Sequence, residues 1–297
     1  MNLELTYYNK MSKDALIDQT LAPSAGTSNN TVKANLGSVK NYGFEALVNG
    51  QILNKSIVAW DVTFSGAHNT NKLVTLGKDP TGKDIPPIIG TTISQKAGYP
   101  LNSYWTRPFK WSDANGDGII TPSEVVIGDT SIFQGYSQPR LEISVTNGFD
   151  LFNRRLRITA LVDHKSGYKV LNSEQQFLCQ QAPSCKDISS LEVPLWRQAR
   201  AVANRFTPVQ TSHGFIEDNT FTRIRELTVS YNVPESFTRK YIRARGASVN
   251  FGVRNLAVFS DWTGVDPEQN YGQGDTQQTL LTAGPPRFYT MRLSLSY

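Results

Sequence analysis

Apolar and polar residues alternate strictly in several stretches of the chain, and the clearest of these stretches ends at the last residue. Within residues 287–297, one face of an extended strand would carry Tyr289, Met291, Leu293, Leu295 and Tyr297, and the other face would be mostly polar. These eleven residues are about what a tilted strand needs to cross a bilayer. The pattern therefore predicts a terminal strand that is long enough to span a membrane.

The same alternation recurs in stretches upstream, at residues 2–10, 40–49, 57–68, 139–149, 155–164, 222–233 and 247–258. Long connections (residues 11–39, 69–137, 165–219 and 260–286) alternate with short or modest ones near Gly50, Asp150 and Pro234. Outer-membrane barrels combine short periplasmic turns with longer extracellular loops. We therefore predict an all-β fold, an antiparallel transmembrane β-barrel whose long loops are extracellular, with a short helix within residues 193–204.

The polar face of the predicted strands carries many charged residues, namely Glu45, Asp61, Glu142, Arg157, Asp163, Glu226 and Arg254, together with Asn250. Unpaired charges in a small core would cost too much free energy. A barrel of about eight strands encloses little interior space. We therefore predict that these are the last strands of a larger barrel with a wet or plugged lumen.

Composition and charge argue against a transmembrane helix and against a nucleic-acid partner. The chain has no apolar run approaching 18 residues, so no transmembrane helix is expected. The net charge of +5 is spread along the chain without a basic stripe interleaved with stacking aromatics, so we expect no nucleic-acid partner.

Met1 is followed by no signal peptide, and we expect this chain to be the carboxy-terminal part of a longer exported protein.

Residues 113–124 match the twelve-position calcium-loop pattern D-x-[DN]-x-[DN]-G-x5-E. The predicted ligands are the side chains of Asp113, Asn115, Asp117 and Glu124 and the carbonyl of Ile119. The flanking sequence, with Pro108 before the loop and Pro122 within it, does not form the helix pair of an EF-hand. The pattern predicts a structural Ca²⁺ that orders an extracellular loop, and a metal-free cluster of Asx turns is the alternative.

Cys179 and Cys185 have five residues between them, which is not a usual metal spacing. A small structural disulfide in an oxidising compartment is predicted, with two free thiols as the alternative.

No catalytic constellation is present, and we assign no catalytic or cofactor-binding residue. The three histidines, His68, His164 and His213, have no partners at metal or triad spacing. The glycine-rich run 272–275 lacks the strand–turn–helix context of a phosphate loop. We therefore do not expect an enzyme.

Several short motifs occur in an order that resembles one known family. They are Gly98-Tyr99-Pro100-Leu101, the D-A-N-G-D-G run at 113–118, Asn147-Gly148-Phe149-Asp150-Leu151, residues 216–227, Val253-Arg254-Asn255-Leu256, and Gly264-Val265-Asp266-Pro267-Glu268. Together they resemble the carboxy-terminal barrel of SusC/RagA-type TonB-dependent outer-membrane transporters, over nearly all of residues 1–297. The chain departs from the family at Asn219-Thr220-Phe221, where Ser and Tyr would be expected, and in the cysteine-bearing loop 165–219.

The resemblance implies a barrel of about 22 strands in the outer membrane of a Gram-negative type of cell, in contact with its lipid. It implies active import of oligosaccharides or peptides with a SusD-like surface lipoprotein. Energy would come from the TonB–ExbB–ExbD complex, through a plug that, with the signal peptide, would precede Met1.

The alternative is a soluble secreted β-sandwich module that binds calcium and glycans. The surroundings of the apolar face, which carries Tyr42, Trp60, Leu141, Ile158, Val229 and Phe251, distinguish the two. Lipid should meet this face in a barrel, whereas a second sheet should cover it in a sandwich.

Overall fold

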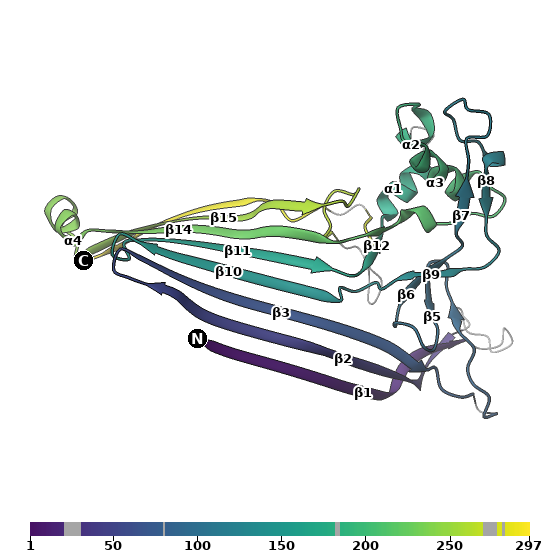
Figure 1. Cartoon of the computed structure of the whole chain (residues 1–297), viewed down its shortest axis with the longest axis horizontal. Coiled ribbons are helices and arrows are strands. Elements are labelled where there is room, and N and C mark those ends of the chain that lie inside the picture. Colours follow the sequence, from purple (N-terminus) through teal and green to yellow (C-terminus); the bar gives the residue numbers. More distant parts are fainter. Residues whose placement is uncertain (21–30, 80, 182–184, 270–277, 281–282) are drawn as a thin grey trace.

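The computed structural model describes residues 1–20, 31–79, 81–181, 185–269, 278–280 and 283–297. One large antiparallel sheet dominates these residues, with its strands side by side in sequence order (Figure 1). Its eight strands are β1 (Asn2–Thr20), β2 (Thr31–Asn54), β3 (Val58–Thr75), β10 (Leu141–Leu151), β11 (Leu156–Ser166), β14 (Phe221–Val233), β15 (Gly246–Ser260) and β16 (Phe288–Ser296). Each of the eight predicted strands is therefore present.

The two ends of the sheet differ as the connection lengths predict. Residues 55–57, 152–155 and 234–245 make the short connections, and the last of these holds α4 (Glu235–Phe237) and a π-helical turn (Thr238–Ile242). Figure 1 shows α4 and the carboxy terminus at one end and the other helices and small sheets at the opposite end. The link expected near Gly50 is instead at residues 55–57, because Gly50 pairs with Val62 within the ladder.

The first predicted loop, residues 11–39, is largely wrong. β1 and β2 continue as a paired ribbon as far as Thr20 and Thr31, and residues 21–30 lie outside the described part. Backbone hydrogen bonds between the two strands hold this extension, and the Ser, Asn, Gly and Thr content of the stretch did not indicate it. A register shift between Ser12 and Ala15, with Asp14 at a φ of 54°, marks a bulge in the ribbon.

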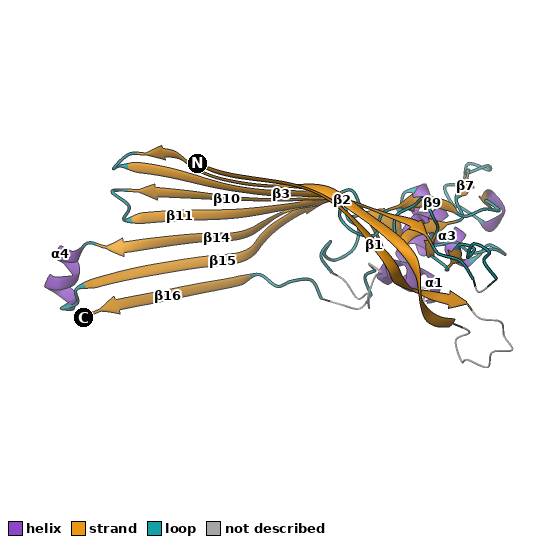
Figure 2. Ribbon diagram, turned by 90° about the horizontal axis from the view of Figure 1, so that it is seen from below, coloured by secondary structure: helices purple, strands orange, loops and turns teal. Residues whose placement is uncertain are grey.

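The apolar face of the sheet is uncovered. Leu5 and Met291 are 71% and 76% exposed, and Trp60 stacks on Phe149 across the strands with ring centroids 5.7 Å apart. In the described residues no second sheet packs on this face, and Figure 2 shows helices only at the ends of the strands. The arrangement fits lipid contact and contradicts the β-sandwich alternative. None of the described helices has both the length and the apolar character to cross a membrane.

Most of the charged residues predicted on the opposite face have ion-pair partners, some of which were not in the predicted set. Arg157 lies 3.0 Å from both Asp61 and Asp150, joining β3, β10 and β11. Further ion pairs are Lys165–Glu142, Arg225–Asp163 and Arg254–Glu226. Cross-strand pairing of this kind lets a polar face line an interior without uncompensated charge.

The connections 76–137 and 167–219, hereafter the loop cap, fold together beyond one end of the large sheet (Figure 1). The cap contains a four-stranded sheet, β4 (Ile88–Ile89), β5 (Ile93–Gln95), β6 (Ser103–Thr106) and β9 (Ile132–Gly135), and the pairs β7 (Phe109–Trp111) with β8 (Val125–Ile127) and β12 (Lys169–Leu171) with β13 (Ile216–Asp218). Its helices are α1 (Ser173–Gln181), α2 (Lys186–Ser189) and α3 (Leu195–Arg205). The helix predicted within residues 193–204 is α3, whereas α1 and α2 were not predicted.

A core of the loop cap joins both connections, with Tyr104 from the first and Phe215 from the second fully buried. Burial of Tyr104 raises the pKa of its phenol above the usual range. The Leu171 amide donates a hydrogen bond of 3.3 Å to the Tyr104 hydroxyl oxygen. The cap is thus a packed unit, not a set of separate loops.

Candidate functional site

The predicted calcium loop lies between β7 and β8, at the outer end of the loop cap. Asp113 accepts hydrogen bonds from the amides of Gly116 (2.8 Å) and Gly118 (3.0 Å), and both glycines have positive φ. Glu124 accepts from the amides of Ala114 and Thr121, each at 2.8 Å. The bonds from Thr121, first of all its amide, hold the pKa of the Glu124 carboxyl below its usual value. The loop is therefore closed by its own amides around the carboxylates of Asp113 and Glu124.

The base of this loop is anchored to α3. Ile120 is 4% exposed and packs with Val125, Ala199 and Val202. The Ile120 amide donates to Gln198 Oε1 (3.1 Å), and Gln198 Nε2 donates to the Gly118 carbonyl (3.1 Å). Ile120 thus anchors a loop that has no EF-hand helices.

The residues predicted to bind calcium all lie in this loop, and some of them bond to one another. Asn115 donates to Asp117 Oδ2 (2.8 Å), and the Ile119 amide donates to Asp117 Oδ1 (2.8 Å). Over the described ranges, no three His, Cys, Asp or Glu side chains gather closely enough to hold an ion. The Asx-turn alternative and the calcium prediction both remain.

The predicted disulfide is confirmed. Cys179 in α1 and Cys185, directly before α2, are bonded, and they are 0% and 4% exposed in the core beside Tyr104 and Phe215. The bond ties two short helices that would otherwise have little apolar area to hold them together.

Buried charges connect the loop cap to the segment after β15. Arg200 of α3 is fully buried and lies 3.1 Å from Asp187 and 2.8 Å from Glu217. Glu217 also accepts the Thr263 hydroxyl at 2.7 Å. The residues that carry the family resemblance at 216–220 therefore act at a junction of elements that lie far apart in sequence.

Residues 262–269, hereafter the strap, are fixed to the charged face of β14 by two arginines. Arg223 lies 2.6 Å from Asp266 and 3.0 Å from Glu268, while Arg225 binds both oxygens of Glu268 at 2.7 Å. Asn219, fully buried, donates to the Pro267 carbonyl at 2.6 Å. The two sequence motifs T-R-I-R and V-D-P-E are thus partners in one clamp. The glycine-rich run 272–275 lies outside the described residues.

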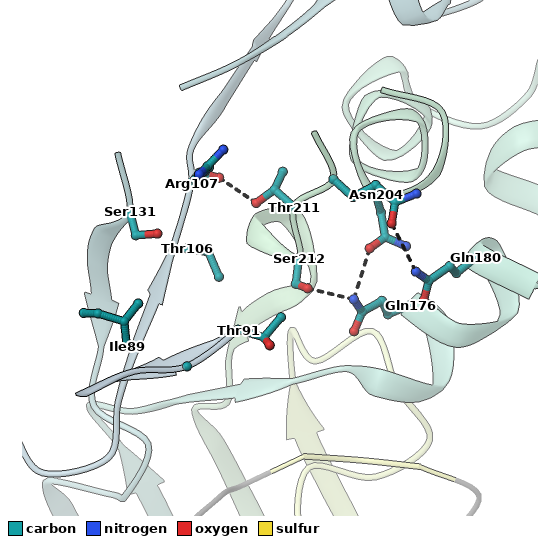
Figure 3. A pocket seen from close by; sticks show the side chains of 12 residues that line it. Ile89, Thr91, Thr106, Arg107, Ser131, Gln176, Gln180, Asn204, Thr211 and Ser212 are labelled. Atoms are coloured by element: carbon teal, nitrogen blue, oxygen red, sulfur yellow. Dashed lines mark hydrogen bonds between the residues drawn. The ribbon is translucent and has the colours of Figure 1, made fainter. Parts of the chain in front are cut away.

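A polar pocket of about 440 Å³ lies within the loop cap (Figure 3). Its lining comes from segments that are far apart in the sequence: Ile89, Gly90, Thr91, Thr106, Arg107, Ser131, Gln176, Gln180, Asn204, Gln210, Thr211 and Ser212. Gln176 Nε2 donates to Asn204 Oδ1 (3.0 Å) and to Ser212 Oγ (2.7 Å), which fixes the orientation of the Asn204 amide. No local sequence pattern marks this site, because its residues come together only after folding.

Each of the three histidines lies close to a polar side chain. His213 lies beside the pocket residue Thr106, with Nδ1 3.3 Å from its hydroxyl, and burial, followed by the nearby Lys169, lowers the pKa of its imidazole. His164 meets Thr222 at 3.0 Å, and His68 lies near Arg140.

Comparison with known proteins gives matches along the whole chain. No protein-family model matches. TonB-dependent receptor P3 of Formosa agariphila is 22% identical over 341 aligned residues, covering 100% of this chain and 32% of the relative. TonB-dependent receptor SusC of Bacteroides thetaiotaomicron is 23% identical, covering 98% of this chain and 29% of the relative. The chain therefore spans about a third of the length of these curated relatives.

Solved structures give the same fold. The RagAB peptide transporter superposes with a TM-score of 0.76 at 18% identity, covering 99% of this chain and 33% of that one. The RagAB peptide importer in the 'closed-closed' state superposes with a TM-score of 0.71. Sequence and fold agree from end to end: the chain is similar to TonB-dependent receptors of the SusC/RagA type, and its large sheet has the fold of a segment of such a β-barrel.

Proposed function

We propose that this chain forms the carboxy-terminal barrel wall and part of the extracellular surface of an active importer. The observation that carries the proposal is the sheet itself, which has an uncovered apolar face, a paired charged face and a folded cap at one end. A wall of this kind separates lipid from a polar lumen.

The complete transporter would extend beyond residues 1–297 on the amino-terminal side. A signal peptide, a plug domain, the segment that contacts the TonB–ExbB–ExbD complex and further strands, to about 22 in all, would precede this part. A SusD-like lipoprotein would cover the loop cap from outside. Oligosaccharides or peptides are the proposed substrates, and the match to a RagAB peptide transporter favours peptides.

Uptake by whole cells tests this proposal. Cells with the intact gene, cells without it and cells without TonB are given labelled peptide and oligosaccharide mixtures. Loss of the same labelled species in both deletion strains is expected. Uptake that requires the gene but persists without TonB would contradict energised import.

We also propose that the loop at residues 113–124 binds a structural Ca²⁺. Asp113, Asn115, Asp117, Glu124 and the Ile119 carbonyl supply the oxygen ligands that Ca²⁺ prefers. The ionised state of Glu124 and the two positive-φ glycines favour such a loop. The ion would stiffen the outer end of the loop cap and would take no part in chemistry.

Proteolysis of the intact protein tests the metal. We expect calcium to slow cleavage within residues 69–137, and we expect Asp117→Ala to remove this protection. Without calcium the two proteins should be cleaved alike. If calcium changes the cleavage of neither protein, the loop holds only its own hydrogen bonds.

A further inference from the structure

We propose that the polar pocket of the loop cap binds the end of a substrate chain that carries a carboxylate beside amide or hydroxyl groups. The inference deepens the proposed function and rests on it only for delivery of the ligand into the cell. Two substrate classes have this chemistry, namely the carboxy terminus of a peptide and an acidic sugar of the uronate type.

The size and lining of the pocket suit a small, strongly polar group. Its volume of about 440 Å³ lies within the usual range for ligand sites. Hydroxyls and carboxamides from both connections of the loop cap dominate the lining, and Ile89 is its one large apolar residue. An apolar ligand would leave these groups without partners, whereas amides and hydroxyls can replace the water around them.

One buried donor in the lining has no partner. Asn204 is 2% exposed, and its amide nitrogen has no hydrogen bond to any residue that the structure describes. Gln176 donates to the oxygen of the same amide, so only the amide nitrogen of Asn204 lacks a hydrogen-bond partner. Buried polar groups without partners are rare in folded proteins and cost free energy. A ligand oxygen would satisfy this donor once the Asn204 side chain turns toward the pocket, because the nitrogen has almost no accessible surface in the structure.

The charge of the pocket favours an anion. Arg107 is the one ionisable residue of the lining, and it makes no ion pair with the described part of the chain. Thr211 donates its hydroxyl to the Arg107 carbonyl at 2.6 Å, which fixes the backbone from which the guanidinium extends (Figure 3). A guanidinium binds carboxylates through two parallel hydrogen bonds. No acidic side chain lines the pocket to oppose this.

Calorimetric titration of the intact receptor in detergent tests the site with two matched pairs of probes. One pair is trialanine and trialanine amide, and the other is trigalacturonate and its methyl ester. We expect one of the acids to bind at least tenfold more tightly than its neutral counterpart, and the pair that shows this difference identifies the substrate class.

Three variants locate the binding. Arg107→Gln should abolish the preference for the acid. Thr91→Asp places a negative charge at an exposed position of the lining and should weaken binding of the acid at least tenfold. Lys110→Gln, an exposed lysine of β7 outside the lining, is the matched control and should bind as the wild type does.

Equal affinity for acid and neutral probes, or unchanged binding in both Arg107→Gln and Thr91→Asp, would overturn the inference, as would a lack of binding by all four probes. TonB-dependent uptake that persists beside such a result leaves the importer proposal standing. If the protein binds the acids selectively but uptake does not depend on TonB, the importer proposal is contradicted and the inferred binding site still holds.

Discussion

At the scale of single residues, the charged face depends on a glycine that leaves room for an ion cluster. Gly148 of β10 lies beside the cluster of Arg157 with Asp61 and Asp150, and a Cβ there would collide with the guanidinium and lie 2.6 Å from Asp61 Oδ2. The motif N-G-F-D, which contributes to the family resemblance, thus has a steric reason.

We therefore expect Gly148→Ala to lower the free energy of unfolding by about 1–3 kcal/mol, as overpacking does. Unfolding in urea, followed in detergent micelles, measures this. Gly50→Ala in β2 is the control, because its Cβ would meet only Ile52 at 3.8 Å, and stability there should stay the same or rise slightly. Equal losses in both variants would show that the ion cluster does not require the glycine.

His213 predicts a pH dependence of the loop cap. Burial and Lys169 lower its pKa from the usual 6.5, so the unfolded chain takes up a proton at a higher pH than the folded cap does. The stability from the neutral imidazole is therefore complete above pH 6.5 and is lost as pH falls toward the folded pKa, below which it levels off.

Protease cleavage of the loop cap at a series of pH values between about 8 and 5 reveals this loss. We expect cleavage to accelerate below pH 6.5, and His213→Gln should reduce the acceleration. His164→Gln, at a histidine that bonds Thr222 outside the cap, should keep the wild-type profile. A profile that His213→Gln leaves unchanged would contradict the assignment.

At the scale of elements, the strap at residues 262–269 is held by charge more than by apolar packing. The Arg223 side chain is 2% exposed and its partner Asp266 is 10% exposed. Removing one member of such a buried pair leaves the other charge in a site with little water.

Arg223→Met should therefore destabilise attachment of the strap by about 3 kcal/mol, with Arg225 still holding Glu268. Amide hydrogen exchange of residues 262–269 measures the change directly. Arg254→Met is the matched control, since the Arg254–Glu226 pair joins β14 to β15 but Arg254 is 66% exposed. Faster exchange in the control than in Arg223→Met would contradict the buried clamp.

At the scale of the whole molecule, the sheet has two unpaired edges among the described residues, on β1 and β16. Open edges cannot persist in hydrocarbon, where backbone groups find no water. In the proposed transporter, the strands that pair with these two edges would be supplied by its other barrel strands.

Residues 1–297 expressed alone should consequently fail to form a heat-resistant barrel in detergent and should aggregate through the edges and the apolar face. The test is the shift in gel mobility between unheated and boiled samples, with the full-length receptor as the positive control. A stable, heat-modifiable monomer of residues 1–297 would show that β1 and β16 can pair with each other.

Sequence alone determined the strands, their two faces and the ends to which short and long connections belong. Alternation is a local property of the extended backbone, so Trp60, Ile158 and Val229 could be assigned to the apolar face without knowledge of their neighbours. The cysteine pair and α3 were also predicted, because both depend on residues close together in the chain.

Tertiary structure alone decided the rest. The β1–β2 ribbon beyond Met11 is held by backbone pairing along a stretch rich in Ser, Asn, Gly and Thr, so its sequence did not distinguish it from a loop. The polar pocket, the Arg200 cluster and the strap join residues that are separated by tens of positions, and only folding brings Arg107 to Asn204 or Arg223 to Asp266. A periodic pattern records which face a residue occupies, whereas the partner it meets across a fold depends on contacts that no local pattern encodes.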